Sequence, residues 1–121
     1  MWTYRQSSGE LLKDGRFVAQ GYSGHGAGKN NPACQGVRDV GPIPCGAWEI
    51  VSLTTGMTPH GPYVLHLEPC NGTQTFGRAG FLMHGDSLQH PGEASEGCVI
   101  MQRWVRERVW LSEDRALTVT T

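Results

Sequence analysis

The stretch "GFLMHGDSLQHPGEASEGCVIM", residues 80–101, decides the fold, because two apolar runs flank a polar, glycine-rich segment. The first run, Gly80–His84, is bounded by turn residues and predicts a short buried strand. The second run starts at Cys98 and continues into a helical pattern. We therefore expect His84 at the end of a strand and Cys98 at a turn before a helix.

A cysteine and a histidine that meet in a fold can form a nucleophile and its base. A thiol has an ordinary pKa of about 8.5, so an active cysteine needs a nearby base and a positive local field. Backbone N–H groups at a helix start favour an anion, and Gly97 lets the backbone approach a carbonyl closely. Free cysteines are also among the most buried residue types, so the two residues alone leave an inert structural pair open.

The rest of the chain predicts a mainly β domain with one principal helix. From Met101 onward, apolar residues at Met101, Trp104, Val105 and Val109 form one helix face. We expect Trp104 and Trp110 to face the core and Arg103, Arg106 and Arg108 to lie off this face. Further strands are expected at residues 2–6, 16–22, 47–53, 63–68 and 116–120. Residues 23–46 form a long irregular segment, and such long loops in compact domains often have a function.

The composition fits a single domain spanning residues 1–121, with 38% apolar residues and high counts of glycine (17) and proline (7). Net charge is −1, and no basic stripe indicates a nucleic-acid partner. No apolar run approaches the ~20 residues that cross a bilayer, so we expect no membrane span. The first residues lack the pattern of a secretory signal, which predicts synthesis in the cytoplasm.

Neither the cysteines nor the histidines show the spacing of a metal site. The four cysteines have no CxxC pair, which argues against a zinc cluster. With Cys98 kept free, Cys34, Cys45 and Cys70 allow at most one disulfide, and the pairing stays open. The other histidines, His25, His60, His66 and His90, share no ligand spacing. We expect no metal and no cofactor.

The wider string is more specific than the pair. "MHGDS…SEGCVIM" resembles the signature of the L,D-transpeptidase catalytic domain superfamily, in which histidine–glycine precedes a Ser/Thr–x–Gly–Cys turn. "GPIPCGAWEI", residues 41–50, is similar to a second block of that superfamily. "YSGHGAGKNNP" and "GRAGFLMHGDS" resemble a compact branch that includes the L,D-transpeptidase effectors of bacterial type VI secretion systems and phage-associated proteins. The matches cover residues 22–110.

The resemblance implies a β-sandwich with a helix after the cysteine. It also implies that Cys98 is the nucleophile, His84 the general base and the Gly85 carbonyl the group that orients the imidazole. Ser95 matches the hydroxyl of the turn, and the N–H groups of Gly97 and Cys98 become oxyanion donors. Family members cleave D-Ala from peptidoglycan tetrapeptide stems through an acyl-thioester, which water, a D-amino acid or another stem resolves.

Three further residues are candidates for substrate binding. Arg78 precedes the histidine strand, and a guanidinium suits a substrate carboxylate, although a solvated loop arginine or a structural ion pair fits equally well. Asp86 also fits a turn residue that binds its own backbone. Glu96 stands where cell-wall L,D-transpeptidases carry histidine, and a carboxylate beside the thiol opposes thiolate formation unless it points away. This departure puts cross-linking in doubt more than acylation.

The resemblance and the missing signal pattern together predict an antibacterial effector that acts in the periplasm of a target bacterium, with release at phage lysis as the other route. Its expected partners are the stem tetrapeptide and a cognate immunity protein, and we expect a monomer. Papain-like enzymes place cysteine before histidine, and chymotrypsin-like enzymes need two barrels, so both are disfavoured. A non-catalytic peptidoglycan-binding or phage-associated module remains the alternative.

Overall fold

The computed structural model describes residues 1–121 and contains nine strands, one α-helix and two short 3-10 turns. The elements are β1 (Trp2–Arg5), β2 (Glu10–Lys13), β3 (Arg16–Gln20), β4 (Tyr22–Ser23), η1 (Gly26–Gly28), η2 (Pro32–Cys34), β5 (Gly46–Thr54), β6 (Val64–Cys70), β7 (Leu82–His84), β8 (Val99–Ile100), α1 (Arg103–Leu111) and β9 (Ala116–Thr120). The predicted mainly β class is confirmed.

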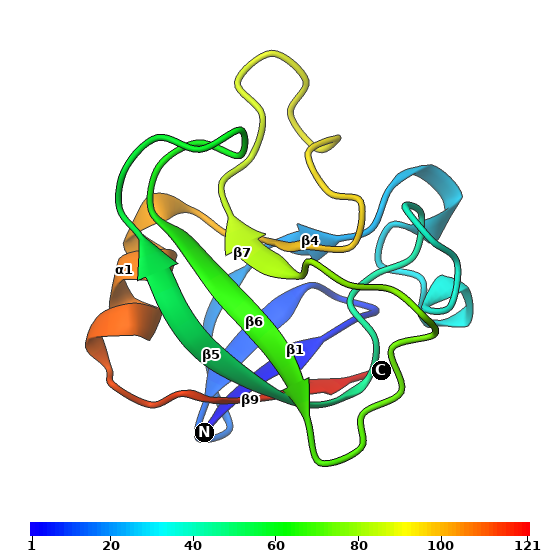
Figure 1. The fold of residues 1–121 in the computed structure, drawn as a ribbon, viewed down its shortest axis with the longest axis horizontal. Helices are drawn as coiled ribbons and strands as arrows, with labels where there is room; N and C mark the ends of the chain where they lie inside the picture. The colour runs from blue at the N-terminus through cyan, green and yellow to red at the C-terminus, as the bar shows by residue number, and fades with distance from the viewer.

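All nine strands belong to one sheet in the order β3-β2-β1-β9-β5-β6-β7-β8-β4. The sheet curls into a nearly closed barrel (Figure 1). The strands of the expected β-sandwich thus belong to one continuous sheet. Its edge strands β3 and β4 are separated in the chain only by Gly21, whose N–H donates to the Gly9 carbonyl. A Cβ at Gly21 would lie 1.8 Å from the Ile100 oxygen, so only glycine fits where the two edges meet.

The barrel is filled by apolar side chains from every part of the chain. The largest fully buried ones include Trp2, Tyr4 and Trp48, which come from β1 and β5. Long β5 and β6 form the most extended pair and cross the front of the barrel, while α1 covers one flank (Figure 1). α1 has nine residues, and no helix reaches the length and apolarity that a bilayer-crossing helix needs.

The helix lies close to its expected position, but two of its side chains differ from the prediction. Val105 and Val109 are buried as expected. Trp104 is 47% exposed, and its indole N–H donates to the Gln102 side chain, so the expectation of a core-facing Trp104 is wrong. Arg106, expected off the apolar face, is only 5% exposed. The first turn of α1 therefore presents an aromatic ring to solvent and buries a cation.

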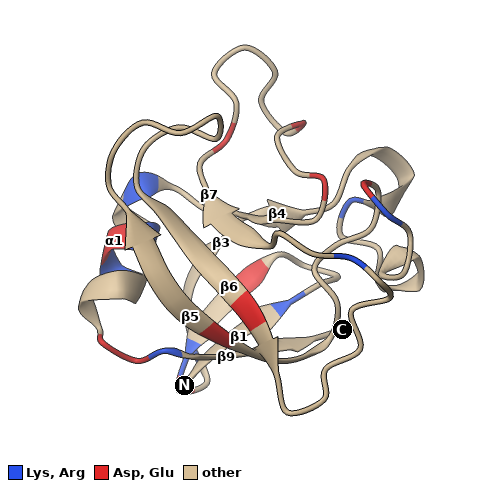
Figure 2. Cartoon of the chain, in the orientation of Figure 1, with Lys and Arg blue, Asp and Glu red and all other residues tan.

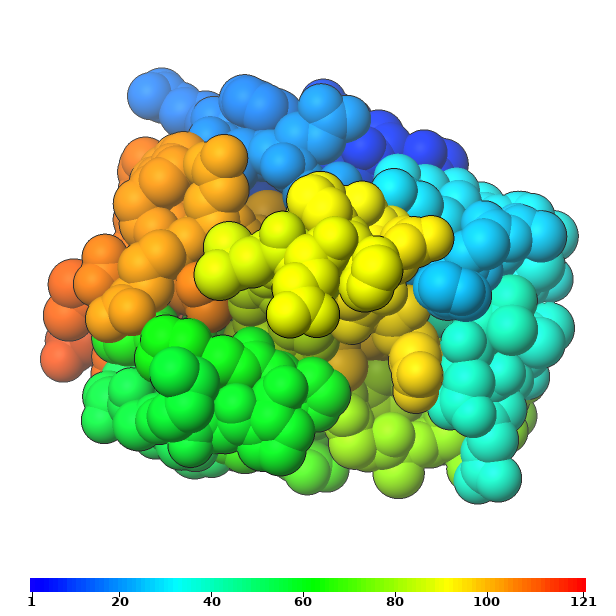
Figure 3. Space-filling view, turned by 90° about the horizontal axis from the view of Figure 1, so that it is seen from above, coloured from blue at the N-terminus to red at the C-terminus, as the bar shows by residue number.

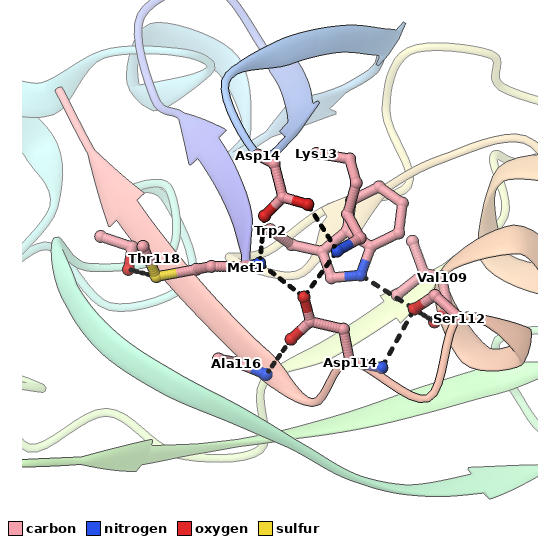
Figure 4. Close-up of polar contacts among 9 residues, drawn as sticks. All are labelled: Met1, Trp2, Lys13, Asp14, Val109, Ser112, Asp114, Ala116 and Thr118. Carbon is pink, nitrogen blue, oxygen red and sulfur yellow. Dashed lines mark hydrogen bonds and ion pairs between the residues drawn. The ribbon is translucent and has the colours of Figure 1, made fainter.

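Charged groups gather where β1, β2 and the segment before β9 come together, as Figure 4 shows. The Lys13 amine lies 2.8 Å from Asp114 and 3.1 Å from Asp14, and the Met1 amine lies 2.7 Å from Asp14. The Trp2 indole N–H donates to the Ser112 hydroxyl at 3.1 Å. Every charge of this cluster thus has a partner of opposite sign.

Candidate active site

His84 ends β7 in the position that the sequence predicts. β7 pairs with β6 on one side and with β8 on the other, and His84 is only 2% exposed. Its Nδ1 lies 2.8 Å from the Gly85 carbonyl oxygen. Because a carbonyl can only accept, this contact places the proton on Nδ1. Nε2 is then a hydrogen-bond acceptor, and it is buried without a partner.

The surroundings of His84 favour its neutral, basic form. Burial lowers the pKa of His84, the Gly85 carbonyl raises it, and the neighbouring His60 and Arg106 lower it further. The exposed His60 ring packs on the His84 ring with centroids 4.6 Å apart. Sequence reasoning did not connect these two residues, because His60 lies in the β5–β6 connection and its spacing carries no signal.

Cys98 lies beside the histidine strand. β7 and β8 pair in parallel with His84 opposite Ile100, and extending this register by two residues puts Cys98 on the same face as His84. The Sγ atom lies 3.9 Å from the Gly80 carbonyl oxygen, and no hydrogen bond joins it to His84. The structure therefore shows a resting thiol that faces a carbonyl.

The thiol is held in its protonated form. Burial is the main reason that the pKa of Cys98 is raised to about 11. The Glu96 carboxylate raises this pKa further, whereas the Leu82 N–H and the Arg78 charge lower it. The predicted influence of Glu96 thus has the expected sign. Since the thiolate is disfavoured, any reaction of this thiol as a nucleophile would need a base to remove its proton.

Ser95 builds the turn that carries Cys98. Its buried hydroxyl accepts from the N–H of Gly24 at 2.9 Å and of Gly97 at 3.1 Å, and it donates to the Cys98 carbonyl at 2.6 Å. The Gly97 N–H is consequently occupied, which corrects the expectation that it is free to bind an oxyanion. The Cys98 N–H makes no hydrogen bond, so this amide is the available donor of the turn.

Arg78 is buried and braces the loops around the site. Its Nη1 donates to the carbonyls of Gln35 and Pro42, and its Nη2 donates to those of Gly41 and Glu96. A Cβ at Gly97 would lie 2.4 Å from Nη2, and Gly97 has φ +132°, so the guanidinium requires glycine there. With four of its N–H groups used inside the protein, Arg78 has a structural role in this state.

Asp86 lies outside the cavity that holds Cys98. Its carboxylate accepts from the Tyr22 hydroxyl at 2.6 Å, the Ser87 N–H at 2.8 Å and the Gly92 N–H at 3.1 Å. Although burial opposes ionisation, these bonds lower the pKa of Asp86. The turn role is therefore the one that the structure shows. Glu96, by contrast, is exposed and lines the Cys98 cavity.

A cavity of about 450 Å³ brings the predicted pair together. His84 and Cys98 line it with Gly97, Arg78 and residues from three loops, among them His25, Arg38, Asp39, His60, Glu93 and Glu96. Seen from above, the yellow loop after β7 lies between the green β5–β6 connection and the cyan segment before β5 (Figure 3). The long irregular segment contributes His25, Arg38 and Asp39 to the lining of this cavity.

The remaining cysteines take no part in this cavity. Cys34, Cys45 and Cys70 are free thiols, as is Cys98. The Cys45 thiol donates to the Gln6 side chain at 3.2 Å, and burial raises the pKa of Cys45. No group of three or more metal-binding side chains occurs.

The fold and cavity define a small barrel-like β domain whose loop end holds a histidine at the end of β7 and a cysteine in the turn just before the neighbouring strand β8. A family model for the Tlde1 domain matches residues 18–120. The chain therefore belongs to the Tlde1 domain family, a family of type VI secretion effector domains. No curated protein and no solved structure matches the chain.

Proposed function

We propose that this domain is a cysteine enzyme that removes the terminal D-Ala from peptidoglycan tetrapeptide stems, as an L,D-carboxypeptidase or a D-amino-acid exchange transpeptidase. The observation that carries the proposal is the neutral His84 with its acceptor nitrogen unpartnered, in the same cavity as Cys98. An unsatisfied buried nitrogen is costly to a folded protein, and such groups concentrate at sites of chemistry.

In the proposed reaction, His84 Nε2 takes the Cys98 proton while Sγ attacks the carbonyl of the L-centre of diaminopimelate. The tetrahedral oxyanion accepts a hydrogen bond from the Cys98 N–H. The intermediate then expels D-Ala, whose amine receives the proton from His84, and an acyl-thioester remains. Water, or the amine of a D-amino acid, attacks this thioester, and the proton passes through His84 back to Cys98 sulfur.

The resting geometry requires one movement before the reaction. The thiol faces the Gly80 carbonyl, so a rotation about the Cys98 side-chain bond must turn it toward Nε2. Catalytic hydrogen bonds are often long in an empty site and shorten when substrate binds. We expect substrate binding in the cavity to cause that rotation.

The rim of the cavity suits a substrate that carries both an amine and carboxylates. Arg38 is exposed there and forms no ion pair, whereas the donors of Arg78 are already used. We assign substrate carboxylates to Arg38 in place of Arg78. The carboxylates of Glu93 and Glu96 lie on the same rim and suit the side-chain amine of diaminopimelate.

The decisive experiment incubates the protein with purified tetrapeptide muropeptides and analyses the products by mass spectrometry. Loss of D-Ala with the wild type, and not with Cys98→Ala, supports the proposal. Unchanged tetrapeptides in both reactions leave a binding module that retains the fold. As a second probe, a carbapenem should acylate Cys98 and add the mass of the drug to the protein.

Membership of an effector domain family supports action in a target cell. We propose that the domain acts in the periplasm and that a cognate immunity protein covers the cavity. Expression with a periplasmic leader should then inhibit bacterial growth, and expression without the leader should not. Equal toxicity from both forms would contradict periplasmic action.

A further inference from the structure

A second cavity, of about 430 Å³, adjoins the residue that follows His84. Its walls come from residues 20–22, 85–88 and 100–103, with Arg106. Neither His84 nor Cys98 lines it. The proposed reaction uses none of its side chains.

The Arg106 guanidinium in this cavity is a buried cation without an acidic partner. Its Nη1 donates to the carbonyls of Pro62 at 3.1 Å and Tyr63 at 3.0 Å. Its Nε is buried with no hydrogen-bond partner, and its Nη2 makes none either. An unpaired charge inside a protein is expensive, and burial accordingly lowers the pKa of Arg106. The unused donors form one edge of the planar group.

The surroundings add positive potential to that edge. α1 begins beside the cavity without a side-chain cap and without an acidic residue in its first turn. A helix start carries a partial positive charge, and the exposed Arg103 also lines the cavity. Figure 2 shows basic (blue) positions on α1. Asp86 is the acidic residue of the lining, and its carboxylate is engaged by the three donors described above.

We propose that this cavity is a carboxylate-binding site, in which one carboxylate accepts hydrogen bonds from Nη2 of Arg106 and, once binding uncovers this buried atom, from Nε. Two parallel N–H groups on one guanidinium edge match the two oxygens of a carboxylate. The ligand class is a free amino acid or a peptide with a terminal carboxylate. The site itself is independent of the proposed function, and only its use by peptidoglycan stems rests on it.

Binding of a carboxylate at this site would change the pKa of His84, the proposed base. A Cβ at Gly85 would lie 3.0 Å from Arg106 Nη2, so the guanidinium packs directly against this glycine. The Gly85 carbonyl in turn holds the His84 Nδ1 proton. After burial, the charge of Arg106 is one of the effects that lower the pKa of His84. A bound carboxylate offsets that charge and makes the imidazole more basic.

The test is a titration of the ¹⁵N-labelled chain, carried out with Cys98→Ala so that no turnover occurs. Sodium acetate is added at constant ionic strength while the Arg106 Nε–Hε resonance is followed by NMR. We expect a saturable shift with acetate and none with chloride. Absence of saturation with acetate, or equal saturation with chloride, would overturn the assignment.

Two matched variants locate the binding. Arg103→Glu reverses a charge on the cavity rim, and Arg108→Glu makes the same change at an exposed position of the same helix that does not line the cavity. We expect acetate affinity to fall about fivefold or more in Arg103→Glu and to stay within about twofold in Arg108→Glu. Equal losses would indicate a general charge effect and refute the site. Both side chains are exposed, so neither variant depends on replacing the buried Arg106.

Further arms identify the source of the carboxylate. D-alanine and the tetrapeptide stem replace acetate in the same titration. A stem that saturates at a lower concentration than acetate assigns the site to peptides, while D-alanine saturating first assigns it to free amino acids. Since binding is measured without catalysis, acetate saturation can succeed even if the muropeptide assay fails.

Discussion

The two ends of the barrel treat their polar groups in opposite ways. At the end that contains Lys13 and Asp114, each charge faces an opposite charge, and the Ser112 hydroxyl satisfies the Trp2 indole (Figure 4). At the loop end, His84 Nε2 and Arg106 Nε are buried without partners. The first arrangement stabilises a fold, and the second is what we expect of groups that a ligand would satisfy. The third buried atom without a partner, Tyr4 Oη, belongs to β1 and lines neither cavity, so the contrast supports the proposed sites at the loop end through His84 and Arg106.

The largest expected effect comes from the unpartnered imidazole. Replacing His84 with Gln should slow acylation of Cys98 by a carbapenem about 10²–10⁴-fold, because the general base is lost. Protein mass spectrometry over time gives the rate. His60→Gln is the control, since that ring packs on His84 from an exposed position and should cost less than about tenfold. Similar losses in both variants would show that His84 acts by packing alone.

The sequence predicts those parts of the site that follow from local pattern. A strand ending at His84, an orienting Gly85 carbonyl and a turn at Cys98 all depend on residues adjacent in the chain. The role of Arg78 could not be predicted, because the carbonyls that it binds are far away in the chain. Three of them lie 36 to 43 residues from Arg78, and the fourth, of Glu96, lies 18 residues away.

The same limit applies to the helix. Periodicity identifies an apolar face, but the face that a helix buries depends on its neighbours. The carbonyls of Pro62 and Tyr63 supply partners that let Arg106 be buried. Closure of the barrel at Gly21 likewise depends on long-range packing, since the clashing atom belongs to Ile100.

Two serines with the same bonding pattern sharpen the comparison between the ends. Ser95 and Ser112 each accept two hydrogen bonds and donate one to a carbonyl. Ser95→Ala should lower the free energy of unfolding by about 2–4 kcal/mol, because it leaves buried donors unsatisfied, and it should also reduce activity. Ser112→Ala also removes the partner of the buried Trp2 indole N–H, but Ser112 is exposed and water can replace its hydroxyl at the Asp114 N–H. Its cost should therefore be smaller, about 1–2 kcal/mol, and activity should be unchanged. Urea unfolding and the muropeptide assay measure both effects, and equal costs would contradict the contrast.

The paired charges should make a smaller, pH-dependent contribution. The hydrogen bond from Lys13, foremost among several, lowers the pKa of Asp114. A carboxyl whose folded pKa is depressed stabilises above its unfolded pKa of about 3.9 and loses that contribution as the pH falls below it. Asp114→Asn should therefore lower Tm by about 3 °C at pH 7 and by progressively less toward pH 2. Asp14→Asn, at a more exposed carboxylate, should do less. A difference that grows as the pH falls would be the wrong sign.

The smallest effect tests the single acidic group that raises the pKa of Cys98. Glu96→Gln removes its charge, so more Cys98 is thiolate at any pH below about 11. At pH 8 we expect Cys98 to react with iodoacetamide about twofold faster, as measured by peptide mapping that separates it from Cys34, Cys45 and Cys70. Glu93→Gln removes a negative charge from the same cavity, but Glu93 is not among the groups that shift the pKa of Cys98. Cys98 in this variant should therefore react at the wild-type rate. Molar salt should erase the gain, because the Glu96 carboxylate is exposed and its field is screened. An unchanged rate in Glu96→Gln would mean that burial alone keeps this thiol protonated. The loop end would then differ from the end that contains Lys13 and Asp114 by desolvation and not by the placement of charges.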